Sequence, residues 1–199
     1  MTPNEGGITR RGLMMRGAVG TAALLSGAAL GGCATGYGIG SAAGIDTRVD
    51  ATRDYLVQTY PSAAPMVQAA QGVLYMPLVT EAAFGPGAAY GEGALRVGGQ
   101  TVDYYSAAKA TFGVQAGAQQ YAHALIFRSS DALAAFRASP GWVAGADAFY
   151  ALPTGGMDIG ADTLALQYPV VAMIFGQSGL MAGAAIEGTK YTRITLSRA

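Results

Sequence analysis

A stretch that mixes glycine with large apolar residues, residues 69–97, most constrains how this chain can fold. Its five glycines stand among Val, Leu, Tyr and Phe, whereas a flexible linker is rich in Gly and Ser without large apolar residues. Glycine inside a strand marks a bulge, a sharp bend or a close approach of another backbone. We therefore predict two or three tightly curved strands here, with Gly85, Gly91 and Gly93 at bends or close backbone contacts.

The remainder of the chain favours sheet over helix. Gly98-Gly99 reads as a turn, and the sequence beyond it alternates with a period of two over long stretches, which is typical of strands with one buried face. Helical spacing of apolar residues or helix boundary signals appear in only three segments, residues 46–60, 61–70 and 131–138. About nine short strands and three helices predict an α+β domain with a mainly antiparallel, strongly curved sheet, either barrel-like or a closed sandwich.

Six sequence blocks follow one another between residues 46 and 197: AQGVLYMP (70–77), AFGPG (83–87), YGEGAL (90–95), FGVQAGAQ (112–119), GADA (145–148) and SGLMAGAAIEG (178–188). As an ordered set they resemble the SYLF domain, also called the Ysc84-type lipid-binding domain. The resemblance implies a non-enzymatic domain that contacts membrane phospholipid.

The N-terminus carries targeting signals. Arg10 and Arg11 resemble a twin-arginine export signal, although paired arginines are also ordinary in the charged region of a general signal peptide. The apolar run that follows, residues 17–30, is short for a transmembrane helix. It leads into Leu30-Gly31-Gly32-Cys33, which resembles the bacterial lipobox, so we expect Cys33 to be acylated.

These signals predict the organisation of the chain. We expect residues 1–32 to be an export signal, residues 33–44 a flexible tether of small residues, and residues 45–199 one SYLF-like domain. Cys33 is the only cysteine, which excludes an internal disulfide. Ala34, rather than Asp, follows it, so we predict a lipid-anchored protein of the bacterial cell envelope, at the outer membrane and facing the periplasm.

The charge balance limits the possible partners. Charged residues make up 12% of the chain, and the segment after the leader holds nine basic and eleven acidic residues of the twelve of each in the whole sequence. Without a cluster of Lys and Arg, nucleic acid is not an expected partner, and attraction to anionic lipid by charge alone would be weak. If folding does assemble a basic lipid-contact patch, its first candidates are Arg96, Arg128 and Arg193.

The sequence offers little for catalysis or cofactor binding. Residues 85–91 have one residue too many for a GxGxxG nucleotide motif and open a strand instead of a helix. His123 is the only histidine, and no nearby spacing supplies partners for a metal site or a Ser/His relay. We expect His123 to be a half-buried strand residue with one satisfied nitrogen. The prediction is no enzyme, no cofactor and no metal.

Two functions from different classes remain. The first is a membrane-anchored envelope lipoprotein whose SYLF-like domain binds phospholipid. The second is a structural or interaction lipoprotein, in which the glycine-rich sheet meets another envelope protein and the anchor at Cys33 is the sole lipid contact. Binding of liposomes by a Cys33→Ser protein would separate them.

Overall fold

The computed structural model describes residues 40–145, 148–151, 167–179 and 186–196. Residues 39–199 cluster into one compact unit, distinct from residues 1–38, and only the former unit is considered below. Strands predicted at residues 163–167 and 180–186, and the predicted sites at Arg10, Arg11 and Cys33, lie largely or wholly outside the described residues.

Two very long strands form the centre of the fold. β1 (Gly72–Val97) and β2 (Gln100–Phe127) pair as a single antiparallel hairpin. Gly98 and Gly99 close it with φ of +57° and +81°, as a two-residue type I′ turn requires, so the predicted turn is confirmed. The expectation of short strands is wrong here: β1 has 26 residues and β2 has 28, because the glycines bend a continuous strand instead of ending it.

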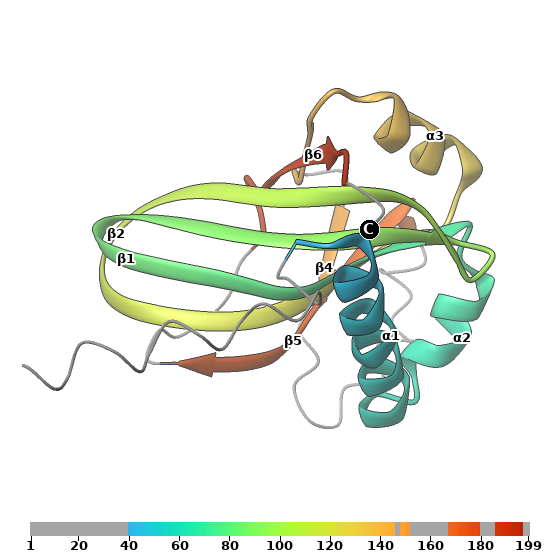
Figure 1. The fold of residues 1–199 in the computed structure, drawn as a ribbon, viewed down its shortest axis with the longest axis horizontal. Helices are drawn as coiled ribbons and strands as arrows, with labels where there is room; N and C mark the ends of the chain where they lie inside the picture. Colours follow the sequence, from blue (N-terminus) through green and yellow to red (C-terminus); the bar gives the residue numbers. More distant parts are fainter. Residues whose placement is uncertain (1–39, 146–147, 152–166, 180–185, 197–199) are drawn as a thin grey trace, which may run out of the picture. The chain divides into compact units, whose positions relative to one another are not determined.

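The hairpin bends back on itself at one end, on the left of Figure 1. Gly85 lies at this bend with φ of +80°. Pairing changes from Phe84 opposite Ala116 to Pro86 opposite Phe112, so β2 uses two more residues than β1 to pass the bend. The extra residues place β2 on the longer path, which is what a sharply curved two-stranded ribbon needs.

Two glycines let the two halves of β1 approach each other after the bend. A Cβ on Gly91 would lie 2.6 Å from the carbonyl oxygen of Leu78, and one on Gly93 would overlap the carbonyl oxygen of Tyr75. Real Cβ atoms do not approach backbone this closely. Gly85, Gly91 and Gly93 therefore lie at a bend or at close backbone contacts, as predicted.

Four shorter strands complete a six-stranded sheet: β3 (Trp142–Val143), β4 (Ala148–Ala151), β5 (Val170–Gly179) and β6 (Lys190–Ile194). The order is β3-β6-β2-β5-β4, with β1 on the other edge of β2. β2 pairs with β6 at residues 104–108 and with β5 at residues 119–127. Among the described strands, only β4 and β5 pair in parallel. This mainly antiparallel, strongly curved half-barrel confirms the predicted α+β class.

Three helices accompany the sheet in the described part of the chain: α1 (Ala42–Thr59), α2 (Ala63–Ala69) and α3 (Ser130–Ala138). All three were predicted, with small differences in their ends. α1 begins earlier than expected because Ser41 caps it, accepting a hydrogen bond from the Gly44 amide. Ser129, and not the neighbouring Ser130, caps α3 by accepting from the Ala132 amide.

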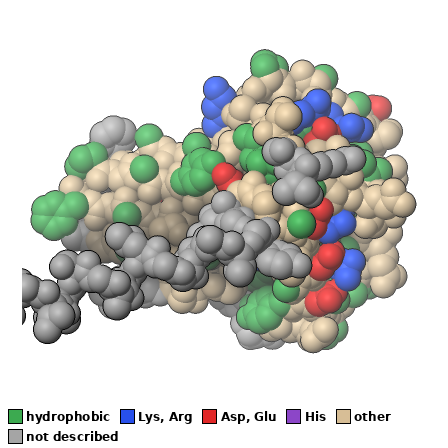
Figure 2. Space-filling model, viewed as in Figure 1, with side chains coloured by type: hydrophobic (Ala, Val, Ile, Leu, Met, Phe, Trp, Pro, Cys, Tyr) green, Lys and Arg blue, Asp and Glu red, His purple; other side chains and the backbone are tan. Residues whose placement is uncertain are grey.

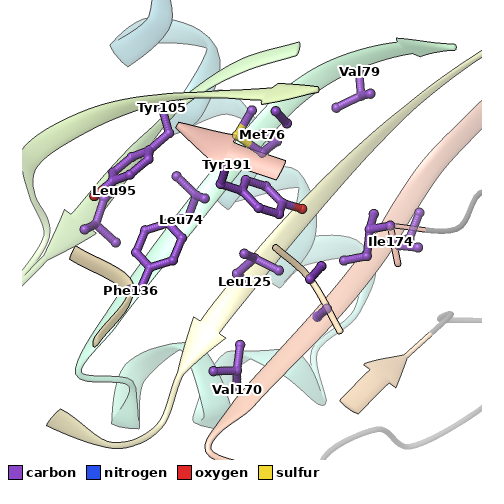
Figure 3. Packing of buried hydrophobic residues seen from close by; sticks show 14 of the residues in the cluster. Leu74, Met76, Val79, Leu95, Tyr105, Leu125, Phe136, Val170, Ile174 and Tyr191 are labelled. Atoms are coloured by element: carbon purple, nitrogen blue, oxygen red, sulfur yellow. The ribbon is translucent and has the colours of Figure 1, made fainter. Parts of the chain in front are cut away.

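Apolar side chains fill both faces of the sheet. One cluster lies inside the curved sheet and includes Leu74, Leu125, Phe136 and Tyr191 (Figure 3). The second lies between the outer face of the sheet and the helices α1 and α2. Its helical members are Ile45, Val49, Leu56, Ala63 and Met66. The helix predicted over residues 46–60 therefore packs on its own sheet.

Asp46 ties the start of α1 to the turn end of the hairpin. Its carboxylate accepts hydrogen bonds from Thr101 Oγ1 at 2.6 Å and from the Tyr104 hydroxyl at 2.8 Å. The guanidinium of Arg96 lies 3.5 Å from the same carboxylate and 2.8 Å from that of Asp50. The acidic side of α1 is thus partly engaged by the sheet.

Candidate functional site

A groove of about 380 Å³ lies where α1, β1, β2 and β5 meet. Its walls come from four elements. They are Ala51, Thr52 and Tyr55 of α1, Pro77 and Leu78 of β1, residues 120–122 of β2, and Phe175, Gly176 and Ser178 of β5. Small-molecule sites typically have volumes of about 300–1,000 Å³ and mostly apolar or aromatic linings with a few polar groups. The size and lining of this groove suit such a ligand.

Two irregularities in strand pairing coincide at the groove. Between Met76 and Val79, β1 has one residue more than β2 needs, and Pro77, which has no amide hydrogen to donate, lies in this bulge. Between Phe175 and Ser178, β5 likewise has one residue more than β2, and Gly176 there has φ of +62°. Both neighbours of β2 therefore bulge next to Tyr121. Bulges re-aim side chains and interrupt regular pairing, which leaves room beside the strand.

Aromatic rings form one wall of the groove. Tyr55 of α1 stacks on Phe175 of β5 with ring centroids 6.2 Å apart, and Tyr60 meets both rings edge-on at 6.5 Å. Phe175 is buried, whereas Tyr55 keeps 46% of its surface exposed and Leu78 keeps 41%. Partly exposed apolar side chains that face one groove offer contact area to an apolar ligand.

None of the residues that line the groove is Asp, Glu, Lys, Arg or His. Its polar side chains are those of Thr52, Tyr55, Gln120 and Ser178. The phenol of Tyr121 belongs to the cluster inside the curved sheet, where burial, and next the charge of Glu81, raise the pKa of Tyr121 to about 12. The groove can therefore hold an uncharged, largely apolar group and hydrogen-bond a neutral polar one.

The three arginines predicted as candidates for a basic patch contact different partners. Arg96 pairs with Asp46 and Asp50. Arg193 lies 3.5 Å from Asp103 and donates to the carbonyl of Arg137 at 2.6 Å. Arg128 donates to the carbonyl of Tyr168 at 3.2 Å. Arg96 and Arg193 thus form ion pairs with carboxylates, and none of the three arginines lines the groove.

His123 is completely buried, not half-buried as expected. Its Nε2 lies 2.7 Å from the Tyr191 hydroxyl, and burial lowers the pKa of the imidazole to about 3. Within the described ranges, no group of three or more His, Cys, Asp or Glu side chains is placed to hold a metal ion. The nearest buried acid along the hairpin, Glu81, accepts a hydrogen bond from Gln119 at 3.0 Å.

The groove was not predicted from sequence. Its walls come from four segments that span more than a hundred positions, so no local spacing brings Tyr55, Leu78 and Phe175 together. One signal was available: Pro77 and Gly176 both interrupt apolar strand patterns, as residues at bulges do.

Comparison with known families adds to this geometry. Residues 108–195 match the family model Ysc84. Its description reads "Las17-binding protein actin regulator". The predicted resemblance is thereby confirmed for β5, β6, α3 and most of β2, all of which lie within the Ysc84 match. No curated protein matches the sequence. None of the described helices of this Ysc84-like fold has the length and hydropathy needed to cross a membrane.

Proposed function

We propose that this protein is a non-enzymatic lipid-binding lipoprotein whose domain takes one acyl chain of a phospholipid into the groove between α1 and the sheet. The observation that carries the proposal is the lining of the groove, in which aromatic and aliphatic side chains surround a space without a single charged group. A hydrocarbon chain fits such a lining because burial of apolar surface is favourable and no charge has to be desolvated.

The polar side chains of the groove suit the ester-linked end of the acyl chain. Thr52, Gln120 and Ser178 can donate to the ester carbonyls that link acyl chains to glycerol. The match to the Ysc84 family, together with the resemblance to a lipid-binding domain, supports this ligand class.

The proposal includes the anchor. Acylated Cys33 would hold the protein on the membrane after export directed by Arg10 and Arg11, in the bacterial envelope and at the periplasmic side of the outer membrane. The domain would then meet the phospholipids of the membrane to which it is attached.

Binding of monomeric lipid tests the groove directly. The probe is a short-chain lysophosphatidylcholine below its micelle concentration, titrated into residues 33–199 carrying Cys33→Ser. We expect Leu78→Ser and Ala51→Trp to weaken binding at least about tenfold, the first by removing apolar contact and the second by filling the groove. Val143→Ser is the matched control, since Val143 is 52% exposed and lies outside the groove. Equal affinity in all variants would reject the groove as the site.

A second candidate function is binding of another envelope protein, with no lipid beyond the anchor. The family description favours it, because it names a protein partner. Failure of the wild-type domain to bind either monomeric lipid or vesicles would favour this alternative.

A further inference from the structure

The bent end of the β1–β2 hairpin exposes a large apolar side chain. Phe84 keeps 86% of its surface accessible, more than any other exposed large hydrophobic residue among those the structure describes. It stands next to Gly85 and Pro86 at the bend, and its partner across the hairpin is Ala116. An exposed phenylalanine at a projecting bend is poorly explained by stability, since burial of its ring would be favourable.

Charge is absent from this end of the hairpin. Residues 82–88 of β1 and their partners, residues 110–118 of β2, contain no Asp, Glu, Lys or Arg. Figure 2 shows charged side chains gathered over the part of the molecule that carries α1 and α3, and hydrophobic side chains at the opposite end, where the hairpin bends. A charge-free apolar end fits a hydrocarbon layer, from which charged groups are excluded.

Amphipathic and charged residues appear only farther back from the bend. Tyr90 is 53% exposed, and its hydroxyl donates to Glu92 at 2.9 Å. Lys109 pairs in register with Ala89 on the neighbouring strand. Tyrosine is enriched where membrane hydrocarbon meets the headgroups, and lysine can reach the headgroup layer with a long apolar stem. Lys109 and Tyr90 therefore lie at nearly the same level of the hairpin, farther from the bend than Phe84, as expected of residues at the headgroup layer.

The length of the tether is compatible with this orientation. The described chain starts at Gly40, beside the carboxylate of Glu92, which lies 3.7 Å from where a Cβ on Gly40 would be. Glu92 is seven residue steps from Gly85, or about 23 Å along a strand. Gly40 is also seven residue steps from Cys33, and a fully extended chain of that length spans at most about 25 Å. The proposed acyl anchor and Phe84 are thus within reach of one membrane surface.

We infer that the bend of the β1–β2 hairpin docks on the membrane by inserting Phe84 into its apolar layer. This inference rests on the proposed lipid-binding function and names the element that meets the bilayer. It assigns different residues to vesicle docking and to monomeric lipid binding, because Phe84 does not line the groove.

Vesicles of phosphatidylethanolamine and phosphatidylglycerol test the inference with residues 33–199 carrying Cys33→Ser. We expect Phe84→Ser to weaken vesicle binding about tenfold while leaving the affinity for monomeric lysophosphatidylcholine unchanged. Phe84→Trp should restore vesicle binding. Its added fluorescence, above that of the native Trp142, should shift to the blue with vesicles and be quenched by lipids brominated on their acyl chains. Val143→Ser, a comparably exposed apolar position, should bind like wild type.

The remaining results distinguish docking by the bend from lipid binding in the groove. Unchanged vesicle binding by Phe84→Ser, or an introduced tryptophan that brominated chains fail to quench, overturns the docking inference while binding of the lysolipid leaves the groove intact. Phe84-dependent vesicle binding without any lysolipid binding supports docking by the bend and rejects the groove. Absence of vesicle binding by the wild-type domain overturns the inference.

Discussion

The hydroxyl of Tyr191 in β6 lies 2.7 Å from Nε2 of His123 in β2, and both side chains are buried. β6 pairs with β2 only at residues 104–108, far along the strand from His123. The hydrogen bond therefore crosses the interior of the curved sheet and links its two halves. His123 Nδ1, by contrast, is buried without a hydrogen-bond partner among the described residues.

Protonation of His123 should destabilise the fold. Burial lowers its pKa from 6.5 to about 3, so the unfolded chain binds a proton between these values that the folded chain does not. The contribution of neutral His123 is complete above pH 6.5 and is lost as pH falls toward 3, by up to about 1.4 kcal/mol per pH unit. We expect chemical denaturation between pH 7 and 5 to show this loss. His123→Gln, which cannot titrate, should flatten the curve over the same range, and an equally steep curve for this variant would contradict the assignment.

Gly93→Ala should destabilise the protein by about 1–3 kcal/mol, because the new Cβ would overlap the carbonyl of Tyr75 and force the two halves of β1 apart. Gly98→Asn is the matched control. It replaces a glycine of the same hairpin at φ of +57° with open space around it, in a turn type that accepts Asn before Gly. Thermal unfolding should separate the two variants by several degrees, and equal melting temperatures would mean that the close approach is not maintained in solution.

Vesicle binding by the Cys33→Ser domain should be weak and should change less than about threefold between low and physiological salt. Both proposed contacts, the groove and the bend, lack charged residues, and screening acts only on charge. Co-sedimentation at two salt concentrations measures this. Strong binding that disappears as salt rises would instead indicate a basic patch, with Arg96, Arg128 and Arg193 as the first residues to replace.

Cys33→Ser in the full-length protein should move it from the membrane fraction to the soluble fraction. Acyl chains contribute about 0.8 kcal/mol for each buried CH₂, and two or more chains hold a protein firmly. Fractionation of cells after a high-salt wash gives the readout, with wild type as the reference. A variant that stays in washed membranes would show that the domain, or an uncleaved leader, provides the attachment.

Local signals predicted the helices and the turn well. Pro61 and the Gly98-Gly99 pair act on their immediate neighbours, and the helix and turn ends fall within a few residues of the expected positions. The two strands of the hairpin were predicted as several shorter ones. Gly85 and Pro86 are strong interruption signals, yet pairing with β2 continues on both sides of them, since a glycine can bend a strand without ending it.

The candidate sites were harder to predict, because they depend on distant segments. The period-two pattern at residues 121–127 correctly put Tyr121, Leu125 and Phe127 on one face. His123 shares this face, but the pattern could not show that Tyr191 of the distant strand β6 reaches it across the interior of the curved sheet, so His123 was expected to be only half-buried. Similarly, the exposure of Phe84 follows from the bend of the whole hairpin, and a pattern of residues in one segment carries no information about that bend.

The fold needs β2 as one uninterrupted strand. One of its edges pairs with β1 along nearly its whole length, and the other edge is shared between β6 near its start and β5 near its end. The matched segment, residues 108–195, begins inside this strand. A fragment cut there would lose β1 and most of the partner of β6, leaving a long unpaired edge that invites aggregation. The stretch that the family model recognises is therefore shorter than the smallest piece expected to fold, which has to start before α1.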